Sequence, residues 1–268
     1  MLLSCSTPML PSATLTTQAE SLRDWGYDAI AVFQPIELWN SDVHQELRDL
    51  ESRTGVRPVE FVLVGDIYGN AMSPDAALRE QCRDMYRRAA DVCAELSLVT
   101  EIEYEYGPQN PMPLFDPYQQ PADAEAEEFT AFYRELLDRV SGSDAAILLE
   151  PLNRYESRYL NSVSDNLAVL QQVAHPNAGL LPDTFHMSIE EASVPASLRA
   201  AGDQVRHVHL GDSNRLLPGS GALDWTEIFG ALRDIDYTGA INLECSTEGD
   251  PAHTLPRTAS RLRDLIAA

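Results

Sequence analysis

Short apolar runs alternate with helix-like segments along the whole chain of 268 residues. The runs are aliphatic and β-branched, as in the buried strands of a parallel sheet, and the segments between them repeat apolar positions at helical spacing. This pattern predicts strands at residues 2–6, 28–33, 59–64, 98–104, 145–150, 179–183, 205–209 and 240–244. It predicts helices at residues 15–25, 38–53, 74–96, 122–140, 163–174, 188–201, 225–235 and 251–267.

This order of elements favours the α/β class and a single (β/α)8 TIM barrel, a fold that carries eight strand–helix units in about 250 residues. We expect one barrel domain that spans residues 1–268, because no linker or low-complexity segment divides the chain. The competing architecture is an open doubly wound sheet. It would place a glycine-rich phosphate turn after the first strand, whereas this chain continues with STPMLPSAT.

The charge balance restricts the classes of partner. The chain has 42 acidic and 19 basic residues, a formal net charge of −23, and no lysine. A field of this sign repels phosphate backbones and anionic lipids, so we expect no nucleic-acid partner and no membrane partner. The simplest interpretation is a well-solvated acidic surface. Such a surface also suits a host with a salty cytosol, and a halophilic, acidic proteome is our hypothesis for it.

We expect a cytoplasmic protein. No stretch approaches the ~18 apolar residues of a membrane helix, and the opening MLLSCSTPML lacks the charged and apolar regions of an export signal. The cysteines form no CxxC pair, and a cytosolic setting disfavours disulfides. We therefore expect four free thiols, at Cys5, Cys82, Cys93 and Cys245.

Four side chains with metal-binding chemistry close apolar runs in the second half of the chain. The runs AILLE, AGLLPD, VRHVH and AINLE end at Glu150, Asp183, His209 and Glu244. The carboxyl ends of barrel strands converge on one rim, so these side chains are predicted to meet there. Any one of them alone could instead be a helix cap, an ion-pair partner or a core histidine. Their coincidence at four strand ends favours a site for a divalent metal.

The chemistry of this set indicates which ion and which reaction to expect. Three carboxylates and one imidazole suit Mn²⁺ first, with Mg²⁺ and Co²⁺ as alternatives, better than a structural zinc. A metal that holds a carbonyl and its neighbouring hydroxyl acidifies the C–H between them and stabilises the enediolate. Glu150 and Glu244 come from well-separated strands and could exchange a proton on opposite faces of a bound sugar.

Longer strings around these residues carry a family resemblance. They are LLEPLNRYE (148–156), PDTFHM (182–187), HVHLGDSNRLLPGSGALDW (207–225) and YTGAINLE (237–244). They resemble the xylose isomerase-like TIM-barrel superfamily of sugar isomerases and epimerases, and within it the D-tagatose and D-psicose (allulose) 3-epimerase branch. The resemblance covers about residues 145–245.

The resemblance implies roles for individual residues and a sugar as the small-molecule substrate. It implies that the metal ligands are Glu150, Asp183, His209 and Glu244, and that the catalytic acid/base pair is Glu150 and Glu244. It implies that the substrate oxygens near C1 to C3 are held by Glu156, His186 and Arg215. Relatives on this barrel often pair, so a homodimer or homotetramer is an open expectation.

The residues by themselves leave alternatives for these substrate contacts. Glu156 could be a solvated carboxylate, and Arg215 could form an ordinary ion pair with Asp212. His186 lies within one helical turn of a ligand, where a donor to the metal shell or to the substrate is plausible. His207 shares the face of His209 by the two-residue period and is predicted to lie one layer deeper in the barrel.

The leading prediction is an isomerase, a metal-dependent epimerase that acts at C3 of a ketose through an enediolate. The alternatives are an aldose–ketose or hydroxypyruvate-type isomerase, which moves the proton between C1 and C2, and an inosose-type dehydratase on the same site. The strand ends of the first half (FQP, VGDIYGN and EIEYEYGPQNP) match no family string, so the sugar and its phosphorylation state stay open. The proline-rich segment 107–121 is predicted to be a loop on the catalytic rim and a partial lid.

Overall fold

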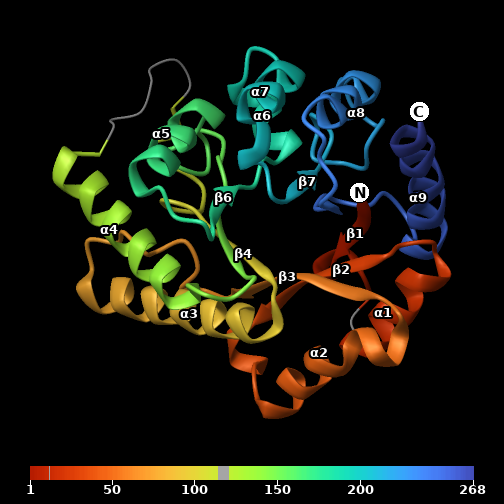
Figure 1. Ribbon diagram of the computed structural model, residues 1–268, viewed down its shortest axis with the longest axis horizontal. Coiled ribbons are helices and arrows are strands. Elements are labelled where there is room, and N and C mark those ends of the chain that lie inside the picture. The colour runs from red at the N-terminus through yellow and green to blue at the C-terminus, as the bar shows by residue number, and fades with distance from the viewer. Residues whose placement is uncertain (12, 114–120) are drawn as a thin grey trace.

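The chain forms a ring of parallel strands surrounded by helices. The computed structural model describes residues 1–11, 13–113 and 121–268 (Figure 1), so the predicted lid lies partly outside the described residues. The strands are β1 (Leu2–Ser6), β2 (Ala29–Pro35), β3 (Arg57–Val64), β4 (Val99–Ile102), β5 (Ala146–Leu149), β6 (Ala178–Leu180), β7 (Val208–Leu210) and β8 (Ala240–Leu243). This arrangement confirms the predicted (β/α)8 TIM barrel.

Helices follow the strands and cover the outside of the ring (Figure 1). They are α1 (Leu15–Asp24), α2 (Ser41–Thr54), α3 (Ala76–Leu96), α4 (Asp123–Val140), α5 (Val163–Val173), α6 (Thr184–Glu190), α7 (Val194–Ala201), α8 (Trp225–Asp234) and α9 (Pro251–Ala267). Short 3₁₀ turns lie at Thr7–Met9, Ile36–Leu38 and Gly202–Gln204.

The barrel closes at a weak seam between β6 and β7. The hydrogen-bonded strand order is β6-β5-β4-β3-β2-β1-β8-β7, with every pair parallel. Strands β6 and β7 stand at the two ends of that order. Two isolated bridges, Leu180 to Val205 and Asp183 to His209, join them and close the ring.

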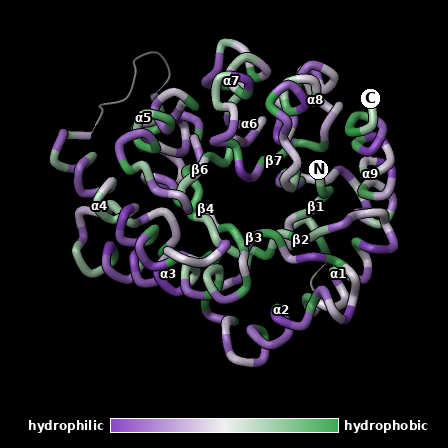
Figure 2. The backbone as a smooth tube through the Cα atoms, in the orientation of Figure 1, coloured by the Kyte–Doolittle hydropathy of each residue, from purple (hydrophilic) through white to green (hydrophobic). Residues whose placement is uncertain are grey.

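The main hydrophobic core lies between the strands and the helices. Figure 2 shows hydrophobic backbone along the strands and hydrophilic positions along the outer helices. Helix α8 is one example: its buried stripe includes Ile228, Phe229 and Leu232, and Asp224 caps its first turn. A much smaller apolar cluster contains Ala146, Leu148 and Leu181 and is separate from the main core.

The structure corrects one predicted helix. The segment 188–201 forms two helices, α6 and α7, because Glu191 adopts an extended backbone conformation and Ser193 caps a new helix. Helix α6 already begins at Thr184, since the Asp183 carboxylate accepts hydrogen bonds from the first turn.

Two predicted strands are also shorter than expected, and this changes where two site residues lie. The strand at 179–183 covers only Ala178–Leu180, so Asp183 follows the strand as a helix cap rather than ending it. The strand at 205–209 covers Val208–Leu210, so His209 lies inside it. The backbone bridge between Asp183 and His209 nevertheless keeps the two residues side by side.

Two further expectations concern the thiols and the membrane. All four cysteines are free, as predicted. Within residues 1–11, 13–113 and 121–268, no helix has the length and apolar character that crossing a bilayer requires.

Candidate metal centre and active site

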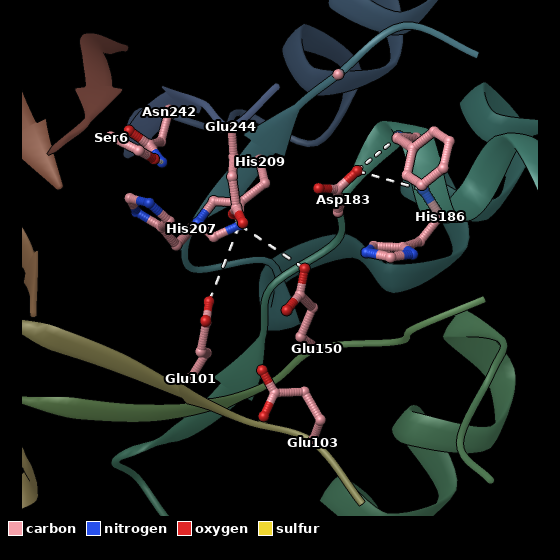
Figure 3. A network of polar contacts seen from close by, with 12 residues as sticks. Ser6, Glu101, Glu103, Glu150, Asp183, His186, His207, His209, Asn242 and Glu244 are labelled. Atoms are coloured by element: carbon pink, nitrogen blue, oxygen red, sulfur yellow. Dashed lines mark hydrogen bonds and ion pairs between the residues drawn. The ribbon is translucent and has the colours of Figure 1, made fainter. Parts of the chain in front are cut away.

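Buried acidic and imidazole side chains gather at the centre of the barrel, as Figure 3 shows. Glu150 follows β5, Glu244 follows β8, His209 lies in β7 and Glu101 lies in β4. Each offers one ligand atom, and these four atoms lie within 4.8 Å of one another. A second group with the same spacing contains Glu150, Asp183 and His186. Either group has the composition of a site for a divalent cation.

The His209 ring lies between two sets of carboxylates. Its Nε2 is 3.0 Å from Oε2 of Glu60, which belongs to β3. Its Nδ1 is 2.5 Å from Oε2 of Glu244, 3.7 Å from Oε1 of Glu150 and 3.9 Å from Oε2 of Glu101. Burial alone would lower the pKa of His209, but the charges of Glu60 and Glu244 raise it well above its usual value.

Several polar atoms at this centre lack a hydrogen-bond partner among the described residues. They include Nδ1 of His209, Oε2 of Glu244 and Oε2 of Glu101. The short distance from Nδ1 to Glu244 therefore does not have the alignment of a hydrogen bond. Buried lone pairs that converge without donors are costly, and a cation at their centre would satisfy them. The donor set therefore fits a divalent metal.

The Asp183 carboxylate accepts hydrogen bonds from the backbone and also belongs to the second group of ligand atoms. Its Oδ1 accepts from the backbone N–H of Phe185 at 2.6 Å and of His186 at 3.3 Å. Burial, followed by the negative charge of Glu244, raises the pKa of Asp183 to about 6. The backbone bonds orient this carboxylate at the mouth of the barrel.

The three candidate substrate residues lie side by side. Arg215 Nη1 donates to Glu156 Oε1 at 2.7 Å, and the Asn153 side-chain amide donates to the same oxygen at 3.1 Å. That Asn153 amide nitrogen is also 2.7 Å from Nδ1 of His186, and the Asn153 backbone N–H lies 3.1 Å from the same ring nitrogen. Asn153 therefore connects the other residues into one row of polar groups.

The alternative partner of Arg215 is excluded by this geometry. Asp212 instead accepts from the indole N–H of Trp225 at 2.8 Å and from the backbone N–H of Gly219 at 2.6 Å. Arg215 stacks over the ring of Phe185, with its guanidinium carbon 4.7 Å from the ring centre. Asp212 thus shapes the loop, and Arg215 is aimed at the site.

A cavity of about 440 Å³ opens beside the centre. Its lining includes Ser6 and Met9 from the first strand and its turn, together with Arg215, Glu244 and Cys245. A ligand in this cavity would contact both the Glu244 carboxylate of the central cluster and the Arg215 guanidinium. Other, larger cavities lie between outer helices and loops, away from this chemistry.

Sequence reasoning missed three buried carboxylates in the first half of the chain: Glu60, Glu101 and Glu103. Two signals in the sequence could have revealed them. Glu60 interrupts the apolar run PVEFVLV, and Glu101 and Glu103 alternate with Ile102 in EIEYE, which places both glutamates on one face of a strand. An isolated acid in an otherwise buried strand needs a partner, and that partner was not visible from the sequence.

Glu60 and Glu103 do have partners. Burial alone would raise the pKa of Glu60, but His209 and His207 lower it well below its usual value. His207 Nε2 is 3.4 Å from Glu60, and this ring lies inside the barrel as predicted.

Glu103 is held by hydroxyl groups. Its two oxygens accept from Tyr68 at 2.5 Å and from Tyr86 at 2.9 Å. Burial raises the pKa of Glu103 to about 7 despite these two hydrogen bonds. Both of its oxygens are thus occupied within the protein.

Comparison with known proteins agrees with this fold. The family model described as xylose isomerase-like TIM barrel matches residues 19–265. The D-psicose 3-epimerase of Agrobacterium fabrum is 35% identical over 184 residues, which are 65% of this chain and 60% of that protein. The ketose 3-epimerase of Arthrobacter globiformis is 32% identical over 196 residues, or 73% of this chain and 66% of that protein. The D-psicose 3-epimerase of Enterocloster bolteae is 42% identical over 111 residues, only 41% of this chain and 37% of that protein. The alignments thus span roughly a third to two thirds of these curated relatives.

Solved structures support the fold over the full length. A 3-keto-D-glucoside 4-epimerase from Escherichia coli superimposes with a TM-score of 0.86 at 21% identity, covering 98% of this chain and 99% of that one. A D-psicose 3-epimerase from Clostridium cellulolyticum, solved with D-tagatose, gives a TM-score of 0.81 at 23% identity, covering 100% and 98%. At these identities the agreement concerns the architecture alone.

Proposed function

The chain belongs to the xylose isomerase-like TIM-barrel family, and from this premise we propose that it is a metal-dependent isomerase that epimerises a ketose at C3. The observation that carries the proposal is the set of buried ligand atoms on Glu244, Glu101 and His209 that have no hydrogen-bond partner among the described residues. The curated relatives reported above are ketose 3-epimerases, which favours epimerisation over C1–C2 isomerisation or dehydration.

We assign the metal to Glu150, Asp183, His209 and Glu244. Glu150, His209 and Glu244 belong to one group of converging ligand atoms, and Asp183 belongs to the second group, which shares Glu150. Three carboxylates and one imidazole favour Mn²⁺, with Mg²⁺ and Co²⁺ as alternatives. When bound, the ion would hold two adjacent oxygens of the sugar and stabilise the enediolate.

Glu150 and Glu244 are the proposed acid/base pair. They follow β5 and β8, which are not neighbours in the sheet, so their carboxylates approach the centre from different sides. One carboxylate removes the proton at C3 and the other returns a proton to the opposite face of that carbon. Burial raises the pKa of Glu150 well above its usual value, which favours its protonated form.

The row formed by Glu156, His186 and Arg215 is proposed to hold the sugar oxygens near C1 to C3. Burial and the nearby Arg215 lower the pKa of His186, so its ring stays neutral and can act as a hydrogen-bond donor or acceptor. The ion pair with Glu156 holds the Arg215 guanidinium, and Arg215 lines the cavity.

Isotope exchange tests the reaction class. The Mn²⁺-loaded protein would be incubated in D₂O with fructose, tagatose and ribulose, and the products read by NMR and carbohydrate chromatography. The proposal predicts deuterium at C3 together with the C3 epimer. Deuterium that appears only at C1 would overturn it in favour of an aldose–ketose isomerase.

The acidic surface is proposed to be an adaptation to high salt. With a net charge of −23, self-repulsion is screened as the Debye length falls from about 10 Å at 0.1 M salt to about 3 Å at 1 M. The melting temperature should therefore rise with KCl over that range. A protein that is most stable in dilute buffer would contradict this proposal.

A further inference from the structure

Glu101 is the carboxylate at this centre for which neither the resemblance nor the acid/base chemistry assigns a task. It lies in β4 and its side chain is 3% exposed. Its Oε1 accepts from the Tyr68 hydroxyl at 2.9 Å. Its Oε2 has no hydrogen-bond partner among the described residues and lies 3.9 Å from Nδ1 of His209.

We propose that Glu101 is a further ligand of the divalent ion, which makes this a centre of four carboxylates and one imidazole. The inference rests on the proposed function, because it concerns the same ion. The geometric basis is that Glu101, Glu150, His209 and Glu244 offer ligand atoms that all lie within 4.8 Å of one another. In Figure 3 the Glu101 side chain rises from its strand toward Glu244 and His209.

The surroundings of Glu101 favour a cation. Glu150 and Glu244, which belong to the same group of ligand atoms, repel its charge, and Nε2 of His209 faces Glu60 instead. A buried carboxylate oxygen without a donor is costly in a site of low polarity, and removal from water magnifies the repulsion between like charges. A divalent ion among these oxygens removes both costs.

Glu103, just past the end of the same strand, shows what a satisfied carboxylate looks like. It lies two residues further along, is equally buried, and accepts from a tyrosine hydroxyl at each oxygen. Glu101 shares Tyr68 with it but keeps its second oxygen free. The two residues differ in exposure by very little, so the difference between them is the free oxygen that faces the centre.

This ligand would leave less room for the substrate on the ion. Five protein side chains would occupy all but one position of a six-coordinate ion. A sugar that binds through two oxygens would then need one protein oxygen to withdraw. Glu101, like Asp183 and His209, exchanges no proton in the proposed reaction, so its role would be to hold the ion.

Metal binding without sugar tests the inference. The full chain would be freed of metal by chelation and titrated with MnCl₂ by calorimetry and by Mn²⁺ EPR, for the parent protein, Glu101→Gln and Glu103→Gln. Both variants replace a buried carboxyl group at or just past the end of β4 with an amide, and only the first removes the proposed ligand. We expect Glu101→Gln to weaken Mn²⁺ binding at least about tenfold more than Glu103→Gln does, and to change the EPR spectrum of the bound ion.

Equal Mn²⁺ affinities in the two variants would overturn the inference while leaving the proposed reaction intact. If Glu101→Gln does not fold by circular dichroism, Glu101→Asp replaces it. Its shorter side chain withdraws the carboxylate, so an unchanged Mn²⁺ affinity in that variant would also overturn the inference. The D₂O experiment on the parent protein judges the epimerase reaction separately, because deuterium at C3 does not depend on which residue holds the resting ion.

Discussion

The two halves of the barrel supply the centre in different ways. In the second half, Glu150 and Glu244 directly follow their strands, at the rim where barrel enzymes place their chemistry. In the first half, Glu60 and Glu101 lie inside β3 and β4, among apolar neighbours. The difference teaches that the rim provides the groups for reaction, whereas the strand interiors provide charge that orients and holds those groups.

Carboxylates at the rim and inside the strands also differ in how they are solvated. A carboxylate at the rim can be reached by solvent and substrate, as the partial exposure of Glu244 shows. A carboxylate inside a strand has lost its water and must be satisfied by protein or by a cation. His209 contacts one oxygen of Glu60, whereas the other oxygen has no hydrogen-bond partner among the described residues. Tyrosines satisfy Glu103, and the proposed ion would satisfy Glu101.

Removal of the metal should have the largest effect on activity, because the proposed ion is bound by residues from both halves of the barrel. Dialysis against a chelator is expected to reduce epimerisation to the background rate, and added Mn²⁺ should restore it. The measurement is conversion of fructose by carbohydrate chromatography. Full activity in a sample shown by elemental analysis to be free of metal would contradict the proposed site.

Loss of either rim carboxylate should have the second-largest effect on activity. Glu150→Gln and Glu244→Gln are each expected to lower turnover by at least ~10², the usual contribution of a positioned acid or base. The matched control is Glu248→Gln, an exposed glutamate four residues after Glu244, which should keep full turnover. Parent-like activity in both active-site variants would remove them from the mechanism.

A pH effect on stability should follow from Glu103. Burial raises its pKa from 4.5 to about 7, so the folded state prefers the protonated form. Its contribution to stability is full below pH 4.5 and is lost as the pH rises through about 7, on the order of 3 kcal/mol in all.

Urea unfolding of the metal-free protein across this pH range measures the effect. Glu103→Gln should flatten the decline in the free energy of unfolding. Part of the slope should remain, since Asp183 also has a raised pKa of about 6. An identical pH profile in the parent protein and the variant would show that Glu103 is ionised at little cost.

The smallest effect is expected from the carboxylate that orients His209. Glu60→Gln removes the charge behind Nε2 and should weaken Mn²⁺ binding by about 10- to 100-fold, as for other partners of metal-bound histidines. His207→Gln is the control, because His207 contacts Glu60 at 3.4 Å but is not a proposed ligand of the ion. Equal weakening in both variants would indicate general damage to the barrel interior rather than orientation of one ring.

The barrel itself could be predicted from the sequence because hydrophobic positions repeat with different periods in strands and in helices. These periods depend only on neighbouring residues. All eight strands lie where the apolar runs predicted them, with ends that move by a few residues. The break between α6 and α7 was missed, since it depends on the cap at Ser193 and on an extended Glu191 inside an otherwise continuous pattern.

The site was predictable only where chemistry coincides with a strand end. Glu150, Asp183, His209 and Glu244 could be named because each stands near such an end and inside a family string. Glu101 and Glu60 could not, because their partners come from β7 and β8, more than a hundred residues away. The role of a buried acid depends on the residues that surround it, and only the folded structure shows which residues these are.

The weak seam of the ring gives the ion a role in cohesion as well as in chemistry. The bridge nearest the mouth joins Asp183 to His209, and the amide of His209 donates to the carbonyl of Pro182 at 3.0 Å. Both bridged residues are proposed ligands, so the cation fastens the first and last edges of the sheet to each other. Chelation should therefore speed amide exchange at His209 and Arg206 before it affects the continuous ladder between β1 and β2.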